Sequence, residues 1–233
     1  MIIMKVVILA GGKGTRLSEY TKTIPKPMIK IGNKTILEHI IQYYEKFGFK
    51  DFIIASGYKS KIIENHFKYK KNIKIINTGL NTLTGLRIKK LEKYLNKTFM
   101  LTYGDGLSNI NLYKLLKFHK KNKRLATLTS VHPPARFGEI QIKKNLVSEF
   151  EEKPQLQKGW INGGFFVFEP GFFKFLSTKK NVMLEREPMQ KMVKKGELSA
   201  YKHEGFWFCM DNLRDKNVLE NLVKLKKAPW LKK

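Results

Sequence analysis

The residues best suited to chemistry near the start of the chain form a glycine-rich turn that ends in a cation. Residues 6–10 are a short apolar run, which is typical of a strand buried on both faces of a sheet. The glycines that follow lack a Cβ atom, so the backbone N–H groups can approach an anion closely. The turn is therefore a candidate phosphate site, although the glycines alone fit an ordinary strand-to-helix turn equally well. The candidate nucleotide-binding residues here are Leu9, Ala10, Gly11, Gly12, Gly14 and Thr15, followed by Arg16.

Two familiar glycine motifs are excluded. A dinucleotide fingerprint requires a third glycine three residues after the second, and counting from Gly12 and Gly14 that position is Leu17. A Walker loop requires Gly-Lys-Ser/Thr, whereas Lys13 is followed by Gly14.

Two aspartates each follow an apolar run and could hold a metal ion. Asp105 lies between Gly104 and Gly106, directly after the expected strand at 99–103, and Asp211 ends the apolar run 205–210. Carboxylates at strand ends are suitable ligands for Mg²⁺. An Asp-Gly pair is also a common turn, and Asp211 could equally cap the helix expected to begin near Arg214.

Polar loops elsewhere supply further candidates. The glycine-punctuated segment 77–85 leads into a helical pattern at 86–95, and a helix N-terminus suits an anion. The candidate residues in this segment and at the start of the helical pattern are Thr82, Gly85 and Arg87, and for Arg87 alone a solvated surface position would be the better explanation. Later segments contain Gly138, Glu152, Lys153 and Asn162, which are residue types suited to sugar hydroxyls and a sugar phosphate, but also to turns.

Alternating strand and helix signals predict an α/β fold with a mostly parallel central sheet flanked by helices. Thr35 and Glu38 form a capping box that starts a helix ending at Gly48. Period-two patterns at 139–142 and 146–150 around Lys144-Asn145 predict a hairpin. The remaining elements are expected as strands at 52–55, 73–76 and 126–131 and a helix at 112–122.

Composition narrows the classes of protein. The 233 residues suit one domain with a substantial core, and no apolar run is long enough to span a membrane. The single cysteine, Cys209, cannot form an internal disulfide, which favours a reducing cytoplasm. The formal charge is +27, but only six of the 46 basic residues are arginine, so a lysine-rich solvated surface is favoured over a nucleic-acid groove.

Two motifs together resemble those of the sugar-1-phosphate nucleotidylyltransferases. The family signature Gly-Gly-x-Gly-Thr-Arg-Leu followed by Pro-Lys-Pro-Met/Leu is present at residues 11–17 and 25–28, and the resemblance runs from Met4 to about Trp230. It implies a Rossmann-like nucleotide-diphospho-sugar transferase fold with a small β-rich sugar-binding portion. The implied single domain covers residues 1–233, with a nucleotide half at about 1–131 and a sugar-phosphate half at about 132–233.

The resemblance also implies an activity and residue roles. A sugar-1-phosphate would attack the α-phosphate of a nucleoside triphosphate, with Arg16 and Lys26 as catalytic cations and Mg²⁺ held by Asp105 and Asp211. The candidates in segment 77–85 and Gly104 would bind the nucleotide, and those at 138–162 the sugar phosphate. A homo-oligomer in the cytoplasm is expected, with no nucleic-acid or membrane partner.

Within the family, the segments around Trp207 and Trp230 resemble glucose-1-phosphate cytidylyltransferases, so CTP and glucose-1-phosphate are the leading substrates. The chain departs from that group in two places. The region at 69–77 is shorter than in its members, and Thr-Gly-Gly-Arg is replaced by Thr-Gly-Leu-Arg at 84–87. UTP, dTTP or GTP with another sugar-1-phosphate is the first alternative, and a basic nucleic-acid-binding module is the second.

Overall fold

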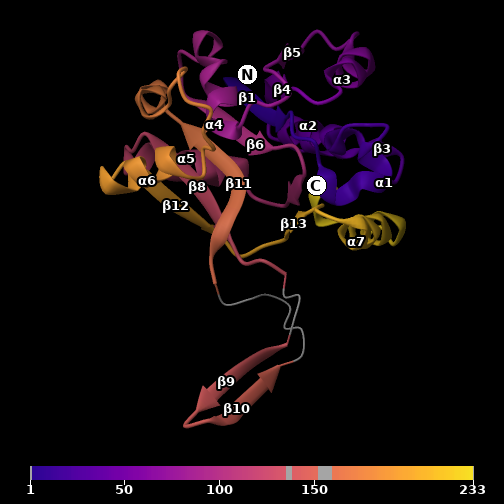
Figure 1. Ribbon diagram of the computed structural model, residues 1–233, viewed down its shortest axis with the longest axis vertical. Coiled ribbons are helices and arrows are strands. Elements are labelled where there is room, and N and C mark those ends of the chain that lie inside the picture. Colours follow the sequence, from indigo (N-terminus) through magenta and orange to yellow (C-terminus); the bar gives the residue numbers. More distant parts are fainter. Residues whose placement is uncertain (1, 135–137, 152–158, 233) are drawn as a thin grey trace.

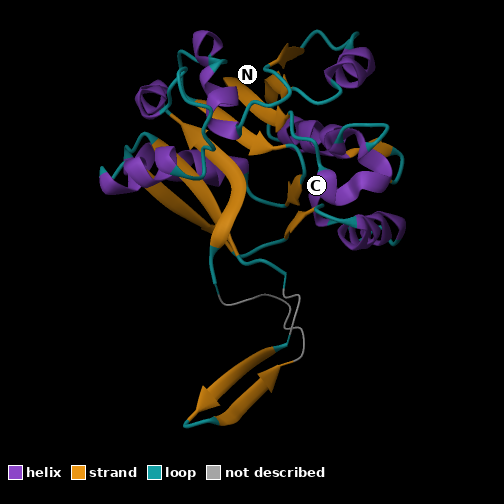
Figure 2. Cartoon of the chain, viewed as in Figure 1, coloured by secondary structure: helices purple, strands orange, loops and turns teal. Residues whose placement is uncertain are grey.

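The computed structural model describes residues 2–134, 138–151 and 159–232, and its centre is a seven-stranded sheet. The strand order is β12-β8-β11-β6-β1-β4-β5, with helices on both faces (Figures 1 and 2). These strands span Ile2–Ala10 (β1), Phe49–Ser56 (β4), Ile73–Asn77 (β5), Phe99–Tyr103 (β6), Ala126–Val131 (β8), Ile161–Phe168 (β11) and Leu198–His203 (β12). The predicted α/β class is confirmed.

The sheet is parallel except at β11, which runs antiparallel to both of its neighbours, β6 and β8. All other neighbouring strands in the sheet pair in parallel. Strand β11 comes from the later part of the chain and lies between two strands of the earlier part. Residues far apart in sequence are thereby placed together at the same ends of these neighbouring strands.

Two hydrophobic clusters fill the spaces between the sheet and its helices. Val6, Ile8 and Ala10 of β1 belong to one cluster, and Val7 and Leu9 belong to the other. Alternate side chains of a strand point to opposite faces, so a strand covered on both sides reads as a continuous apolar run. This explains the apolar stretch that precedes the glycine turn.

Each face of the sheet has its own set of helices. The first cluster includes residues of α2 (Ile36–Lys46), α3 (Ser60–Phe67), α5 (Leu112–Asn122) and α7 (Leu213–Lys224). The second includes residues of α4 (Thr84–Lys89), η4 (Pro170–Phe175) and α6 (Glu187–Lys194). Among the described residues, no helix has the length and apolarity needed to cross a bilayer.

Helix boundaries follow the capping signals in the sequence. The predicted capping box is present at α2, where the Thr35 side chain accepts from the Glu38 backbone and the Glu38 side chain accepts from the Thr35 backbone. The helix expected at 86–95 is instead α4 followed by a separate 3₁₀ turn, η3 (Glu92–Tyr94). Ile88, Leu91 and Leu95 are nevertheless all buried, so the apolar spacing identified the buried face correctly.

A neutral histidine joins α2 to the end of the chain. Nε2 of His39 lies 2.9 Å from the Ile31 carbonyl oxygen, and Trp230 Nε1 donates to His39 Nδ1 at 3.3 Å. Because Nδ1 accepts a hydrogen bond, Nε2 carries the proton. Burial lowers the pKa of His39, so the ring is neutral at neutral pH.

The predicted hairpin is confirmed as β9 (Glu139–Lys143) and β10 (Leu146–Glu151). Lys144 and Asn145 both have positive φ, as a tight two-residue hairpin turn requires. The hairpin extends away from the body of the molecule (Figure 1). Several of its large apolar side chains are exposed, and they are Ile140, Ile142, Leu146, Val147 and Phe150.

Candidate functional site

The main cleft opens at the carboxyl ends of β1 and β6, which are neighbours in the sheet. Leu9 pairs with Tyr103, and the Gly104 N–H donates to the Leu9 carbonyl at 3.0 Å. A Cβ atom on Gly104 would lie 2.7 Å from that carbonyl oxygen, so the close approach requires glycine. The cleft volume of about 590 Å³ is within the usual range of small-molecule sites.

The glycine turn is shaped by different constraints at each glycine. Gly14 has φ of 63°, a left-handed angle that favours glycine, and an added Cβ atom would lie 2.9 Å from Lys26 Cβ. Gly11 and Gly12 do not have positive φ, so a left-handed angle is found in this turn at Gly14 only. At Gly11 a side chain is excluded by steric overlap, because a Cβ atom there would lie 2.0 Å from Arg87 Nη1.

Two carboxylates and two cations meet beside this turn. Lys26 Nζ donates to Asp105 Oδ2 at 2.6 Å and to Asp211 Oδ1 at 2.9 Å, and Arg16 Nη1 donates to Asp211 Oδ2 at 2.9 Å. Lys26 lies in the 3₁₀ turn η2 (Lys26–Met28), and its side chain is only 11% exposed, against 71% for Arg16. The predicted convergence of these four residues is therefore present.

Pairing of two short strands brings the aspartates together. Strand β13 (Trp207–Cys209) runs antiparallel to β7 (Gly106–Ser108), and Cys209 is opposite Gly106. The Met210 N–H also donates to the Asp105 carbonyl at 3.0 Å. Asp105 precedes one strand and Asp211 follows the other, so this register places both side chains at the mouth of the sheet.

The pKa values in this cluster reflect burial and mutual attraction. Burial acts to lower the pKa of Lys26, but the charge of Asp105 and the hydrogen bonds to both aspartates together outweigh it, and the pKa is raised overall. Burial acts to raise the pKa of Asp211, but the hydrogen bond and charge of Lys26, with the charge of Arg16, lower it overall. At neutral pH, Lys26 is therefore protonated and Asp211 ionised.

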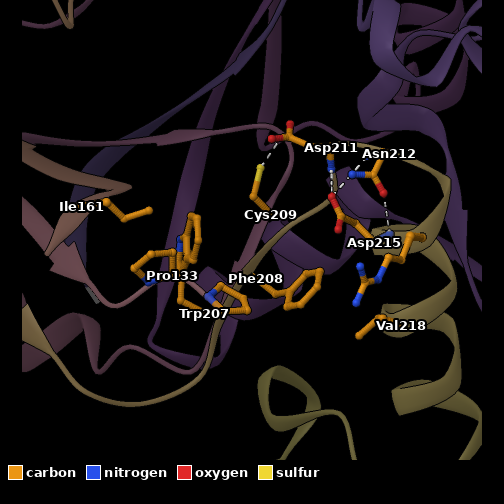
Figure 3. Close-up of a pocket in the computed structure, with 11 residues that line it drawn as sticks. Pro133, Ile161, Trp207, Phe208, Cys209, Asp211, Asn212, Asp215 and Val218 are labelled. Carbon is orange, nitrogen blue, oxygen red and sulfur yellow. Dashed lines mark hydrogen bonds between the residues drawn. The ribbon is translucent and has the colours of Figure 1, made fainter. Parts of the chain in front are cut away.

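The residues present fit a hard divalent cation. Within the described chain, Asp105, Cys209 and Asp211 each offer one ligand atom, and these atoms lie within 4.8 Å of one another. Carboxylate oxygens suit Mg²⁺, whereas a thiol must lose its proton to act as a ligand. Burial raises the pKa of Cys209 well above its usual range, and its thiol faces Asp211 Oδ1 at 3.7 Å (Figure 3). Cys209 also lines the cleft, as a half-buried, protonated thiol.

Asp211 is not the cap of the following helix. The N-cap of α7 is Asn212, which forms a capping box with Asp215, and Figure 3 shows both side chains at the start of that helix. The capping alternative for Asp211 is therefore wrong. Behind Asp211 lies a second pocket of about 340 Å³, which shares Trp207, Cys209 and Asp211 with the main cleft (Figure 3).

Arg87 is buried rather than solvated, with only 3% of its surface exposed. Its guanidinium donates to the carbonyl oxygens of Ser56 at 2.6 Å, Thr82 at 2.6 Å, Gly79 at 3.2 Å and Gly11 at 3.4 Å, and to the Thr78 hydroxyl. These acceptors belong to the glycine turn, the end of β4 and the 77–85 loop. The alternative of a solvated surface position is therefore wrong, and Arg87 instead ties together the loops that line the cleft.

A polar chain that was not foreseen crosses the cleft. Asn162 Nδ2 donates to the Tyr103 hydroxyl at 3.2 Å, Tyr103 donates to Glu185, and Thr84 Oγ1 donates to Glu185 at 2.7 Å. Tyr103 could have been found as the last residue of the strand before Gly104. Glu185 has no sequence signal, because its segment reaches the site through contacts with residues about 100 positions away, such as Leu184 N to Thr84 Oγ1 at 2.8 Å.

Most of the sequence-predicted residues line the cleft. They are Leu9, Ala10, Gly11, Gly12, Gly14, Thr15, Arg16, Lys26, Thr82, Arg87, Gly104, Asp105, Asn162 and Asp211. Gly85 does not line it, because it packs on the Val182 backbone, and Gly138 lies beside the protruding hairpin. Glu152 and Lys153 lie outside the described residues.

Comparisons with known proteins agree with this architecture. The profile of the family described as Nucleotidyl transferase matches residues 5–211. The chain is 41% identical over 254 residues to the glucose-1-phosphate cytidylyltransferase of Salmonella typhimurium, covering 97% of this chain and 98% of that protein. It is 31% identical over 226 residues to the mannose-1-phosphate guanyltransferase of Neurospora crassa, covering 91% of this chain and 62% of that protein.

Solved structures share the fold at lower sequence identity. HddC from Yersinia pseudotuberculosis matches with a TM-score of 0.77 at 24% identity, covering 95% of this chain and all of that one. A UDP-glucose pyrophosphorylase complexed with UDP-glucose matches with a TM-score of 0.74 at 19% identity, covering 97% of this chain and 100% of that one.

Proposed function

The chain belongs to the nucleotidyl transferase family, and on that premise we propose that it joins CTP to glucose-1-phosphate and releases pyrophosphate. The observation that carries this proposal is the convergence of Arg16, Lys26, Asp105 and Asp211 beside the glycine turn. Two polyanionic substrates repel each other, so a site for them needs fixed cations and a place for a metal ion. The similarity to a cytidylyltransferase over nearly the full chain supports this choice of substrates.

The proposed reaction needs alignment more than acid–base chemistry. A phosphate oxygen of glucose-1-phosphate attacks the α-phosphorus of CTP, and the bond from that phosphorus to the oxygen bridging the β-phosphate breaks. The attacking oxygen is already anionic near neutral pH, so no general base is required. Positioning of the two substrates and compensation of charge in the transition state are the protein's contribution.

We assign the cations and the glycine turn to the triphosphate. The turn at 11–15 would bind phosphate oxygens through its N–H groups, and Arg16 and Lys26 would stabilise negative charge on the departing pyrophosphate. The adjoining residues Leu9, Ala10, Thr82 and Gly104, with Gly85 and Arg87 behind them, would shape the nucleotide site. Arg87 would act through the loops that it joins.

We propose Mg²⁺ as the cofactor, held by the carboxylates of Asp105 and Asp211. When bound, it would supply Lewis-acid polarisation and charge compensation for the reacting phosphate oxygens. The donor set supports a hard cation, because both carboxylates are accessible from the cleft and the Cys209 thiol is protonated.

The sugar phosphate is assigned to the opposite side of the cleft. Asn162 lines it there, and its Nδ2 already donates to Tyr103, which shows that its amide is oriented toward the cleft wall. Gly138, Glu152 and Lys153 complete the proposed sugar-phosphate set from the sequence.

We also propose that the protein forms a homo-oligomer in the cytoplasm. Isolated two-stranded hairpins are only marginally stable in water, and β9–β10 exposes several large apolar side chains, including Ile142 at 64% and Phe150 at 67%. A partner subunit would cover such a surface. Measurement of the molecular mass in solution tests this, and a monomer at micromolar concentration would contradict it.

A pyrophosphate-release screen tests the proposed activity. Each common nucleoside triphosphate is incubated with a panel of sugar-1-phosphates and Mg²⁺, and the highest kcat/KM is expected for CTP with glucose-1-phosphate. A higher value for UTP, dTTP or GTP would replace the nucleotide assignment. Absence of release with every pair, together with salt-dependent retention on DNA, would favour a nucleic-acid-binding module instead.

A further inference from the structure

The ammonium group of Lys26 lies between the same two carboxylates that would hold the metal ion. Its Nζ is 2.6 Å from Asp105 Oδ2 and 2.9 Å from Asp211 Oδ1. We propose that Lys26 and the metal ion compete for Asp105 and Asp211, and that nucleotide phosphates release the carboxylates by binding Lys26. Metal and nucleotide would then bind cooperatively. This inference rests on the proposed function, since the metal ion and the triphosphate are taken from it.

The geometry makes the two cations mutually exclusive. Mg²⁺ binds carboxylate oxygens at about 2.1 Å, so an ion bridging Asp105 Oδ2 and Asp211 Oδ1 would need the space that Nζ fills. Two cations within about 3 Å of each other would also repel strongly in a partly buried site. The ion can therefore bind these two oxygens together only when Lys26 has moved.

The glycine turn offers the displaced ammonium a new partner. The stem of Lys26 runs beside that turn, because a Cβ atom on Gly14 would lie 2.9 Å from Lys26 Cβ and 3.5 Å from its Cδ. A phosphate bound to the turn would thus lie close to a flexible four-carbon side chain that carries a compact charge. Movement of Lys26 toward the phosphate exchanges one set of anionic partners for another.

Arg16 provides a matched comparison. It also pairs with Asp211, through Oδ2 at 2.9 Å, but it is largely exposed and, among the described residues, it forms no ion pair with Asp105. Removal of either cation deletes one positive charge near the same carboxylate. Only removal of Lys26 vacates the position between the two aspartates, so the two variants separate competition for a position from general repulsion.

Binding of Mn²⁺ to the protein without substrates, followed by electron paramagnetic resonance, tests the inference. The proteins compared are the wild type, Lys26→Met, Arg16→Met and Lys117→Met, the last removing a charge from the exposed surface of α5. We expect the Kd for Mn²⁺ to fall at least about tenfold in Lys26→Met, which is within the range of ordinary coupling between sites. Arg16→Met should change it about threefold or less, and Lys117→Met should leave it unchanged.

A second measurement examines the coupling itself. The Kd for Mn²⁺ is measured with and without a non-reactive α,β-methylene analogue of CTP. Direct chelation by the phosphates is common to all the proteins, so the ratio of the two Kd values is compared between wild type and variant. The enhancement is the Kd for Mn²⁺ without the analogue divided by the Kd with it. We expect this ratio to be at least about fivefold smaller in Lys26→Met than in the wild type.

Three results would overturn the inference. The Kd for Mn²⁺ could be equal in the wild type and Lys26→Met, it could fall equally in Lys26→Met and Arg16→Met, or the enhancement by the analogue could be unchanged. If the wild type still releases pyrophosphate, these results leave the proposed function intact. If no protein binds Mn²⁺ even with the analogue, the metal site itself fails and the inference fails with it. Lys26→Gln repeats the test with a different side chain, and thermal unfolding confirms that each variant is folded.

Discussion

Replacement of Arg87 by methionine should destabilise the protein, because the guanidinium joins the glycine turn, the end of β4 and the 77–85 loop. Methionine keeps much of the length of the side chain but removes every donor. Ser56 O and Gly11 O would each keep another donor, since Thr78 N binds the first at 3.0 Å and Tyr58 N the second at 3.1 Å. Within the described part of the chain, Arg87 is the hydrogen-bond donor to the carbonyls of Gly79 and Thr82, so the loss of hydrogen bonds affects mainly these two groups.

The expected magnitude follows from those two carbonyl groups. An unsatisfied buried acceptor costs about 1–3 kcal/mol, so these two half-buried carbonyls together cost at most about 2–6 kcal/mol. Removal of a buried charge offsets part of this loss of free energy of unfolding. Burial lowers the pKa of Arg87 and therefore disfavours its charged form. We expect a net loss of about 3 kcal/mol in the free energy of unfolding. For a domain of this size that corresponds to a fall in Tm of about 6–12 °C.

Urea unfolding followed by circular dichroism measures this loss, with Arg124→Met as the matched control. Arg124 is exposed, and its replacement should change the free energy of unfolding by less than about 0.5 kcal/mol. Equal stability of the Arg87→Met and Arg124→Met proteins would show that the guanidinium does not hold the loops together. The Km for CTP should also rise in Arg87→Met, because the 77–85 loop would be less ordered.

Three further predictions concern the charged cluster and the buried histidine. Lys26→Ala should lower kcat by about 10²–10³, as expected for loss of a preorganised electrostatic donor, and steady-state rates near the wild type would remove that role. Asp105→Ala and Asp211→Ala should each abolish the Mg²⁺ dependence of pyrophosphate release, and retained dependence would indicate other ligands. His39 has a lowered pKa in the folded state, so its contribution to stability is complete above about pH 6.5 and is lost as the pH falls toward the folded pKa. Protonation of His39 must break the hydrogen bond from Trp230, so the Tm should fall between pH 7 and pH 5. The fall should be smaller in His39→Gln. An NMR titration that gives a normal pKa for His39 would contradict this prediction.

Elements with strong local signals were predicted well. The strand before the glycine turn, the capping box of α2 and the β9–β10 hairpin all follow from patterns within a few residues. The cap of α7 was also readable. Asn212 has an acidic residue three positions later, at Asp215, whereas Asp211 has Arg214 there, so only Asn212 could form a capping box.

Long-range contacts explain what was missed. The segment that contains Glu185 packs against the 77–85 loop through bonds such as Gly85 N to Val182 O at 3.0 Å, and no local pattern encodes such a pairing. Arg87 was a predicted nucleotide-binding residue, but its burial was not predicted. That burial depends on carbonyl groups from two loops and from the end of β4, and these segments are adjacent only in the folded protein.

Short-range preferences of the chain were thus enough to predict the α/β class, the glycine turn beside the cleft and the residue types of the proposed metal site. The meeting of those residues depends on the order of strands in the folded protein. Asp105 and Asp211 are neighbours because β7 and β13 pair in one particular register, and Lys26 reaches both from a turn 79 and 185 residues away in sequence. Backbone hydrogen bonds and side-chain packing over such distances form together when the chain folds, so the distances that determine the chemistry could be read only from the structure.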